Sequence, residues 1–249
     1  MTKLKQQARS ISDRLSKIAK NLNLPYKLIL TEFIIERLAV RLVAEKSLSH
    51  ALVFKGGYVS LRVYQSPRYT VDLDALLRNG KLSKAVVDAK LAAQTDIRDG
   101  VWFLPERDFS LETQGEYGGH RIVFRTGIGE VLSDVRKAQI INLDIGTGDP
   151  IVPTERTIKT PYLLGNGELS WTVYPVETTV TEKLHALIVR GSLSSRSKDI
   201  FDLVLLIPKC NVDDLRKALI ETFRYRGESM PDNFAETVRN IDGDLLSKG

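Results

Sequence analysis

The sequence predicts an α+β protein, with a mostly antiparallel mixed sheet between N-terminal helices and a helical C-terminal part. Helical spacing of apolar residues fills roughly the first 45 positions, whereas the pattern from Gly100 to Ile145 is β-type with glycine-rich turns. After Pro175 the spacing is helical again. This order implies an α/β core followed by a helical bundle. We therefore expect two domains, residues 1–170 and residues 171–249.

Two helices are expected first. Residues 3–22 carry apolar side chains at near-helical spacing among lysines and arginines, which predicts a peripheral amphipathic helix with a basic face. A second helix is expected from about Tyr26 to Glu45, after Pro25. Its apolar i, i+4 row, typical of a core helix, is Leu30, Ile34, Leu38 and Leu42.

A glycine pair then marks the stretch around which the chain is organised. Val53-Phe54 leads into Gly56-Gly57, which opens a short helix. Bare backbone N–H groups at a helix N-terminus suit a phosphate. The glycine pair therefore predicts a phosphate-binding turn.

A strand with two carboxylates follows the Ser66-Pro67 turn. The segment from Thr70 to Leu77 is rich in β-formers and leucine, and residues two apart in a strand point to the same side. Asp72 and Asp74 would thus present two carboxylates together, which is unfavourable unless a cation, usually divalent, lies between them. The alternative is a solvated edge strand. A phosphate cradle beside a metal-binding Asp-x-Asp is the minimum equipment for moving a nucleotidyl or phosphoryl group.

The middle of the chain completes the sheet. A helix is expected from Lys81 to Gln94, and 170–174 is a candidate short strand, whereas Gly146 to Gly167, with three prolines, predicts an irregular connection. The third of the expected strands, Gln139–Asp144, carries an acidic residue and can lie beside the Asp-x-Asp strand. The expected strands are Val101–Leu104, Arg121–Arg125 and Gln139–Asp144.

The C-terminal part is expected to be helical throughout. One helix begins at Pro175 and ends at Gly191, with Val180, Leu184 and Leu187 on its apolar stripe. The further expected helices are Lys198–Leu206, Asp213–Arg224 and Pro231–Leu246.

Composition limits the function classes. No stretch has the apolar length of a membrane span, the N-terminus lacks the apolar core of a signal peptide, and Cys210 alone excludes a disulfide framework. We therefore expect a cytoplasmic protein. The net charge of +5 favours a polyanionic partner such as nucleic acid. The basic side chains available in the C-terminal half are Arg190, Arg196, Lys198, Arg216, Lys217, Arg224 and Arg226.

The run from Lys55 to Asp74, KGGYVSLRVYQSPRYTVDLD, resembles the signature of AbiEii-type nucleotidyltransferases, the toxin halves of type IV toxin–antitoxin pairs. The resemblance implies a DNA-polymerase-β-like nucleotidyltransferase core. It spans roughly residues 25 to 210 as an ordered set of motifs. The later motifs are Ile141–Gly146, Tyr174–Glu177, Glu182–Ala186 and Arg196–Asp202.

Nucleotidyl transfer needs carboxylates that hold Mg²⁺ or Mn²⁺. Asp72 and Asp74 supply the first two ligands. We expect Asp144 to be the third, because a carboxylate within the apolar run IINLDI would otherwise be buried without a partner. The alternatives are that Asp144 is an ordinary strand-end residue bonded to a turn, and that Asp149 is the third ligand.

Phosphate-binding candidates surround the glycine pair. Arg68 is one and Lys55 a weaker one, and the Thr70 hydroxyl could bond a phosphate or satisfy its neighbours. The resemblance implies a further possibility for Thr70, because some relatives carry a hydroxyl here that becomes phosphorylated and switched off. Ser60 is expected to pack within its helix.

The C-terminal half supplies the second group of candidates. Lys183, nine residues after Tyr174, matches the family's lysine, and its ammonium can neutralise the triphosphate as a point charge. The alternative is a surface lysine. Asp199 is either a helix cap or, by resemblance, a catalytic or lysine-orienting carboxylate.

These features together predict a Mg²⁺-dependent enzyme that transfers a nucleoside monophosphate from an NTP. The resemblance implies a growth-inhibiting toxin of a toxin–antitoxin or phage-abortive system, neutralised by an antitoxin encoded alongside it. It also makes the 3′ end of tRNA the preferred acceptor. The alternatives are a toxin that acts on a protein hydroxyl, a kinase-like reaction, and a module that only binds a nucleotide.

Overall fold

The structure is a computed structural model that describes residues 2–111, 118–190 and 197–239. These form two compact units, each built from several stretches of chain. We call them the core unit and the helical unit. The core unit is Met1–Val63, Pro67–Gly148 and Thr157–Thr172; the helical unit is Tyr64–Ser66, Asp149–Arg156 and Val173–Gly249. The division at residue 170 expected from the sequence stays a prediction.

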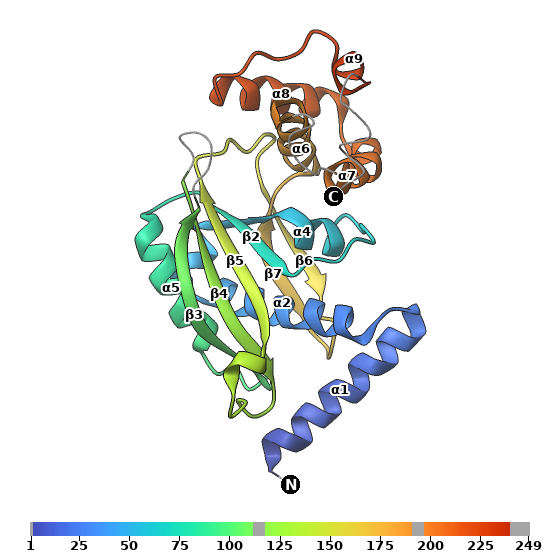
Figure 1. Ribbon diagram of the computed structural model, residues 1–249. Helices are drawn as coiled ribbons and strands as arrows, with labels where there is room; N and C mark the ends of the chain where they lie inside the picture. Colours follow the sequence, from blue (N-terminus) through green and yellow to red (C-terminus); the bar gives the residue numbers. More distant parts are fainter. Residues whose placement is uncertain (1, 112–117, 191–196, 240–249) are drawn as a thin grey trace. The chain divides into compact units, whose positions relative to one another are not determined.

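The core unit is built on one sheet, which within the described residues has seven strands in the order β3-β4-β5-β2-β1-β7-β6 (Figure 1). Neighbours β1/β2, β3/β4 and β4/β5 are antiparallel, whereas β2 and β5 are parallel. The expected mixed, mostly antiparallel sheet is confirmed, and the acidic strand β5 does lie beside β2. The strands are β1 (Leu52–Lys55), β2 (Asp72–Leu77), β3 (Val101–Leu111), β4 (Gly119–Ile128), β5 (Gln139–Thr147), β6 (Arg156–Pro161) and β7 (Glu168–Val173).

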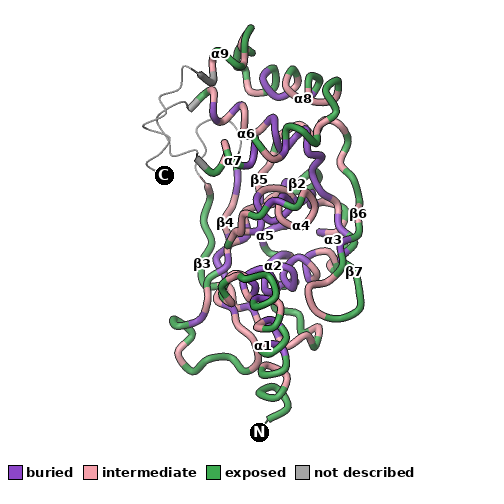
Figure 2. The backbone as a smooth tube through the Cα atoms, turned by 90° about the vertical axis from the view of Figure 1, so that its right-hand side faces the viewer, coloured by how far each residue is buried: buried purple, intermediate pink, exposed green. Residues whose placement is uncertain are grey.

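Helices cover the apolar side of this sheet. The helix α2 is the most buried of them, and it packs against α5, which in turn contacts β3, β4 and β5 (Figure 2). Helix α1 is largely exposed and inserts only one stripe, Ile11, Leu15 and Ala19. The helices of this unit are α1 (Lys3–Leu22), α2 (Tyr26–Ala44), α3 (Lys46–Ser49), α4 (Gly56–Arg62) and α5 (Leu82–Gln94).

Two expectations for the core unit are wrong. The connection from Gly146 to Gly167 is not irregular throughout, because it contains β6. This edge strand is mostly exposed, so its residues lack the apolar alternation that reveals a strand. The strand β2 begins at Asp72 and leaves Thr70 outside. The Thr70 hydroxyl accepts a hydrogen bond from the Asp72 backbone N–H at 3.2 Å, and this local turn competes with strand pairing.

The helical unit has its own apolar core. Its described helices are α6 (Val176–Arg190), α7 (Ser197–Leu206), α8 (Val212–Tyr225) and α9 (Phe234–Arg239). Residues 240–246 of the last expected helix lie outside the described part of the chain. Of the described helices, none is long and apolar enough to cross a membrane. The buried core consists of Val176, Val180, Leu187, Leu203 and Leu206.

Buried ion pairs tie α4 to α2. Arg62, at the end of α4, bonds Glu32 at 2.9 Å and lies 3.1 Å from Glu36, whose other oxygen lies 3.3 Å from Arg37. Glu36 is only 1% exposed and also accepts a hydrogen bond from the Leu163 backbone. Burial raises the pKa of Glu36, although the arginines oppose the shift. These pairs fix the helix that follows the glycine turn.

We expect Glu36→Gln to change how stability depends on pH. The pKa of Glu36 is higher in the folded state than its ordinary value of 4.5. Glu36 therefore contributes fully to stability below pH 4.5, and this contribution is lost as the pH rises through the raised pKa. Denaturant unfolding of the wild type should therefore show a stability loss across this window that Glu36→Gln lacks. The exposed carboxylate variant Asp13→Asn is the control. Identical pH slopes for wild type and Glu36→Gln would refute this account.

Candidate active site

The two carboxylates of β2 lie on the polar face of the sheet. Asp72 and Asp74 are half-buried, whereas Leu73 and Ala75, between and after them, are fully buried on the opposite face. In the parallel pairing of β2 with β5, Asp72 is the register partner of Asn142 and Asp74 that of Asp144. In-register neighbours share a face, so three carboxylates lie on two adjacent strands.

Two polar side chains hold these carboxylates. The Asn142 amide donates to Asp72 Oδ1 at 2.7 Å. Arg121, on β4, donates through Nε and Nη2 to both oxygens of Asp144, at 2.7 and 2.6 Å. These bonds raise the pKa of Arg121, with a further contribution from the charges of Asp72 and Asp74. Asp144 is thus bound to a neighbouring strand and not to a turn.

A row of charges therefore crosses four strands. Lys55 is the register partner of Asp74, Asp74 that of Asp144, and Asp144 that of Arg121. Two carboxylates in the middle of the row have a basic residue at either end. This arrangement offsets the repulsion between neighbouring carboxylates.

The glycine turn packs directly against this row. Gly56 has φ +74°, and a Cβ at this position would lie 2.0 Å from Asp74 Oδ2. A Cβ at Gly57 would lie 3.2 Å from Thr70 Cβ and 3.4 Å from an Arg68 guanidinium nitrogen. Glycine is required at Gly56 because Asp74 occupies the space that a side chain would fill, whereas a side chain at Gly57 would only need Thr70 to shift by a few tenths of an ångström. Ser60 packs within α4, donating to the Gly56 carbonyl at 3.1 Å.

The donor set suits a hard divalent cation in part. Asp72 and Asp74 offer carboxylate oxygens, the ligands that Mg²⁺ and Mn²⁺ prefer, and Asp74 packs directly against Gly56. Asp144 is different, because Arg121 binds both of its oxygens. Among the described residues, no three or more His, Cys, Asp and Glu side chains form a metal-binding group. Asp144 as a third ligand stays a prediction.

The helical unit holds the other candidates. Lys183, on α6, lies 2.9 Å from Asp199 and 2.8 Å from Asp202, both on α7. The Lys183 side chain is 13% exposed and Asp202 is fully buried, so Lys183 is not a surface lysine. Asp149, the alternative third carboxylate, belongs to this unit and accepts a bond from Arg226 at 2.7 Å.

Sequence reasoning missed three residues of these clusters. Asn142 could have been found, because it lies two residues before Asp144 and thus on the same strand face. Asp202 lies one helical turn after Asp199, but its burial depends on packing. Arg121 is 23 residues from its partner Asp144, and no local pattern indicates that pairing.

Comparisons with known proteins identify the family and the fold of this chain. The family model described as nucleotidyl transferase AbiEii toxin, type IV toxin–antitoxin system, matches residues 37–248. No curated protein matches the chain. The crystal structure of JHP933 from Helicobacter pylori is 16% identical with a TM-score of 0.51, covering 90% of this chain and 92% of the other.

Two further solved structures are less similar. The antibiotic-resistance factor ANT(2'')-Ia is 14% identical with a TM-score of 0.43, covering 79% of this chain and 92% of its own. An antigenic nucleotidyltransferase-like protein from Paracoccidioides brasiliensis is 14% identical with a TM-score of 0.42, covering 82% and 93%. The family match, which extends over most of the chain, decides the assignment. This chain belongs to the AbiEii family of nucleotidyltransferase toxins from type IV toxin–antitoxin systems.

Proposed function

We propose that this nucleotidyltransferase transfers a nucleoside monophosphate from an NTP to the 3′ end of tRNA, and thereby inhibits translation and growth. Family membership gives the enzyme class, an NTP as substrate and an antitoxin as partner. The observation that carries the proposal is the pair Asp72 and Asp74 on one sheet face, with Gly56 packed against Asp74. The proposed metal-binding carboxylates therefore lie next to the proposed phosphate-binding glycine turn.

Asp72 and Asp74 are the proposed ligands of a Mg²⁺ or Mn²⁺ ion. Such an ion bridges the triphosphate and lowers the pKa of the attacking hydroxyl. The Asn142 amide orients Asp72 by binding Oδ1, which directs the remaining lone pairs of this carboxylate. A fixed carboxylate loses less conformational entropy when it binds an ion.

Phosphate contacts are assigned to the glycine turn and to basic side chains. Gly56 and Gly57 supply backbone N–H groups, with Arg68, Thr70 and the weaker candidate Lys55 beside them. In the helical unit, Lys183 is proposed to neutralise the triphosphate or the leaving pyrophosphate. Its ion pairs with Asp199 and Asp202 support a positioned ammonium, with Asp199 as an orienting carboxylate.

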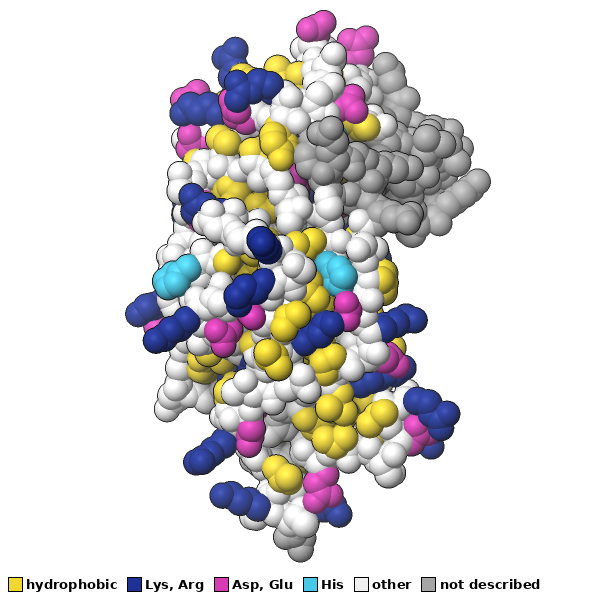
Figure 3. Space-filling view, turned by 90° about the vertical axis from the view of Figure 1, so that its left-hand side faces the viewer, with side chains coloured by type: hydrophobic (Ala, Val, Ile, Leu, Met, Phe, Trp, Pro, Cys, Tyr) yellow, Lys and Arg dark blue, Asp and Glu magenta, His cyan; other side chains and the backbone are white. Residues whose placement is uncertain are grey.

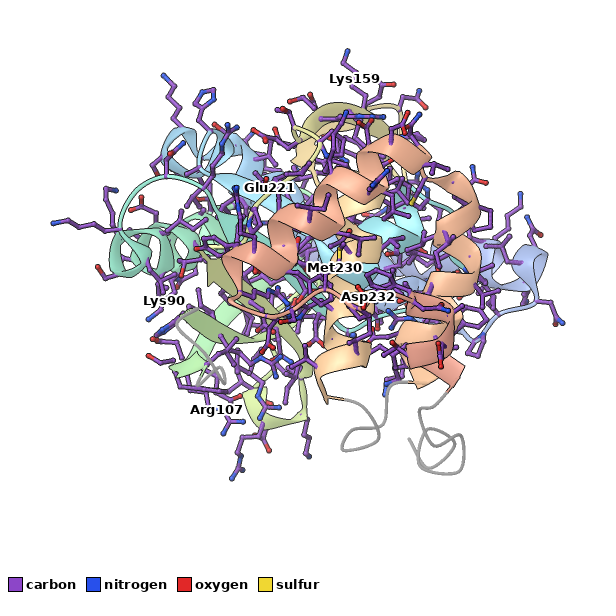
Figure 4. The ribbon with its side chains drawn as sticks, turned by 90° about the horizontal axis from the view of Figure 1, so that it is seen from above. Lys90, Arg107, Lys159, Glu221, Met230 and Asp232 are labelled. Carbon is purple, nitrogen blue, oxygen red and sulfur yellow. The ribbon has the colours of Figure 1, made fainter. Side chains whose placement is uncertain are left out.

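Contact with tRNA would depend on dispersed charge. On the face in Figure 3, the visible Lys and Arg side chains of the described residues are scattered among acidic and apolar ones. Arg107 and Lys159 point outward from β3 and β6 (Figure 4). Of the basic residues expected to bind RNA, Arg226 instead bonds Asp149 and His185 internally, and Arg196 lies outside the described residues. Binding through dispersed charge should weaken steeply with salt.

The first prediction from the proposed function concerns the acceptor of the transferred nucleotide. Incubated with total tRNA, Mg²⁺ and each α-³²P-labelled NTP in turn, the protein should move label into tRNA with one NTP. Asp72→Ala should abolish the transfer, because it removes a metal ligand. Label absent from tRNA with all four NTPs would contradict the tRNA proposal. Label on protein in the same lanes, or transfer from a γ-labelled NTP, would indicate the other acceptor or a kinase-like reaction.

The second prediction uses two glycines with similar backbones. Gly56 and Gly80 both have positive φ, but a Cβ at Gly80 would meet nothing within 4 Å. Both Gly→Ala variants should lose about 1 kcal/mol or more of stability to backbone strain. Only Gly56→Ala should also abolish transfer, because its Cβ displaces Asp74. Equal retention of activity in the two folded variants would show that this close contact is dispensable.

The third prediction separates the structural and catalytic roles of Lys183. Lys183→Met removes the cation that pairs with the buried Asp202 and the half-buried Asp199, which should lower the unfolding free energy by about 3–5 kcal/mol and abolish transfer. Adding Asp199→Asn and Asp202→Asn removes the uncompensated charge, so stability should recover while transfer stays absent. Recovery of transfer in the triple variant would rule out a catalytic role for Lys183.

A further inference from the structure

Arg121 bonds one member of the acidic cluster that Asp72, Asp74 and Asp144 form. Both of its bonds go to Asp144, one to each carboxylate oxygen, in the two-pronged geometry that matches a guanidinium to a carboxylate. The Arg121 side chain is 31% exposed and that of Asp144 is 16% exposed, so solvent screens the pair only in part.

The backbone places Arg121 at this position. It is the direct antiparallel partner of Asp144, and β4 is paired on its other side with β3. A strand hydrogen-bonded on both sides cannot slide relative to its neighbours without breaking its ladder. The sheet therefore delivers a guanidinium to the carboxylate expected to be the third metal ligand.

We propose that Arg121 binds both oxygens of Asp144 and thereby keeps this carboxylate from binding a metal ion. Only Asp72 and Asp74 then bind a divalent ion, and the nucleotide-free site takes a single ion. This rests on the proposed function in taking Asp72 and Asp74 as metal ligands, and it goes further by excluding Asp144. Arg121 already supplies one positive charge to the three carboxylates, and Lys55 supplies another in the same row. A second ion would add two positive charges beside a guanidinium.

The competing arrangement has Asp144 as a metal ligand. In that case, Asp144 would have to bind the ion through a lone pair that Arg121 does not use, or Arg121 would have to leave one of its oxygens. The two arrangements differ in ion number and in the effect of Asp144→Asn. They can therefore be separated by metal binding alone, without measuring nucleotidyl transfer.

The test counts Mn²⁺ ions bound to the nucleotide-free full chain, from the electron paramagnetic resonance signal of unbound Mn²⁺. The wild type should bind one ion, and Asp144→Asn should still bind one. Arg121→Gln should bind a second ion, or the same ion at least about tenfold tighter, because a repelling charge is removed and Asp144 is released. In the double variant Arg121→Gln/Asp144→Asn this gain should disappear.

Two controls isolate the position of the charge. Arg125 is on the same face of β4 as Arg121 and pairs with Glu106, so Arg125→Gln removes a neighbouring arginine of the same strand. Lys159, on β6 at the opposite edge of the sheet, is exposed, and Lys159→Gln removes the same charge far away (Figure 4). Both variants, checked for folding by thermal unfolding, should bind Mn²⁺ as the wild type does.

The proposal is overturned by two ions in the wild type, by loss of an ion in Asp144→Asn, or by an Arg121→Gln variant that matches the wild type. The proposed function fails in a different way: the wild type then binds no Mn²⁺, or binds Mn²⁺ that the Asp72→Asn variant still binds. Even then, a gain in Arg121→Gln that needs Asp144 supports the role of Arg121, and no gain overturns it.

Discussion

The polar face of the sheet is governed by repulsion among three carboxylates on two neighbouring strands. Asp74 and Asp144 are direct register partners, and like charges at such a position oppose strand pairing. The sheet pairs these strands nonetheless, with Arg121 next to Asp144 and Lys55 next to Asp74 in the same row. The basic residues on β4 and β1 thus make the central pairing of β2 with β5 tolerable.

The glycine turn is fixed at both of its ends. At its start, Gly56 lies so close to the Asp74 carboxylate that no other residue fits, and its positive φ independently favours glycine. At the far end of α4, Arg62 is held by the buried carboxylates Glu32 and Glu36 of α2. The buried Tyr58 and Val59 pack this helix against the sheet, and the ion pairs of Arg62 further restrict its position.

How much the sequence could predict depends on how local each interaction is. Asp72 and Asp74 share a face because of the two-residue period of a strand, and the glycine pair ends 15 residues before Asp72. The bond between Arg121 and Asp144 depends on register across two strands, which loop lengths and the whole sheet decide. Thr70 has β propensity, yet its hydroxyl accepts a hydrogen bond from the Asp72 backbone N–H, and the strand begins only at Asp72. Local rules therefore predicted the carboxylate pair and the nearby Lys55, but not Arg121 on β4.

Arg121 in the core unit and Lys183 in the helical unit pair with carboxylates through different chemistry. Arg121 presents a planar fork to both oxygens of one carboxylate, an arrangement that satisfies the pair completely and keeps its charge at any physiological pH. Lys183 is a point charge shared between Asp199 and Asp202, on separate turns of α7. An ammonium with three donors can exchange one carboxylate for a phosphate oxygen and stay bonded to the other. A fixed neutralising charge is thus best made from arginine, as at Arg121, and an exchangeable one from lysine, which is the role proposed for Lys183.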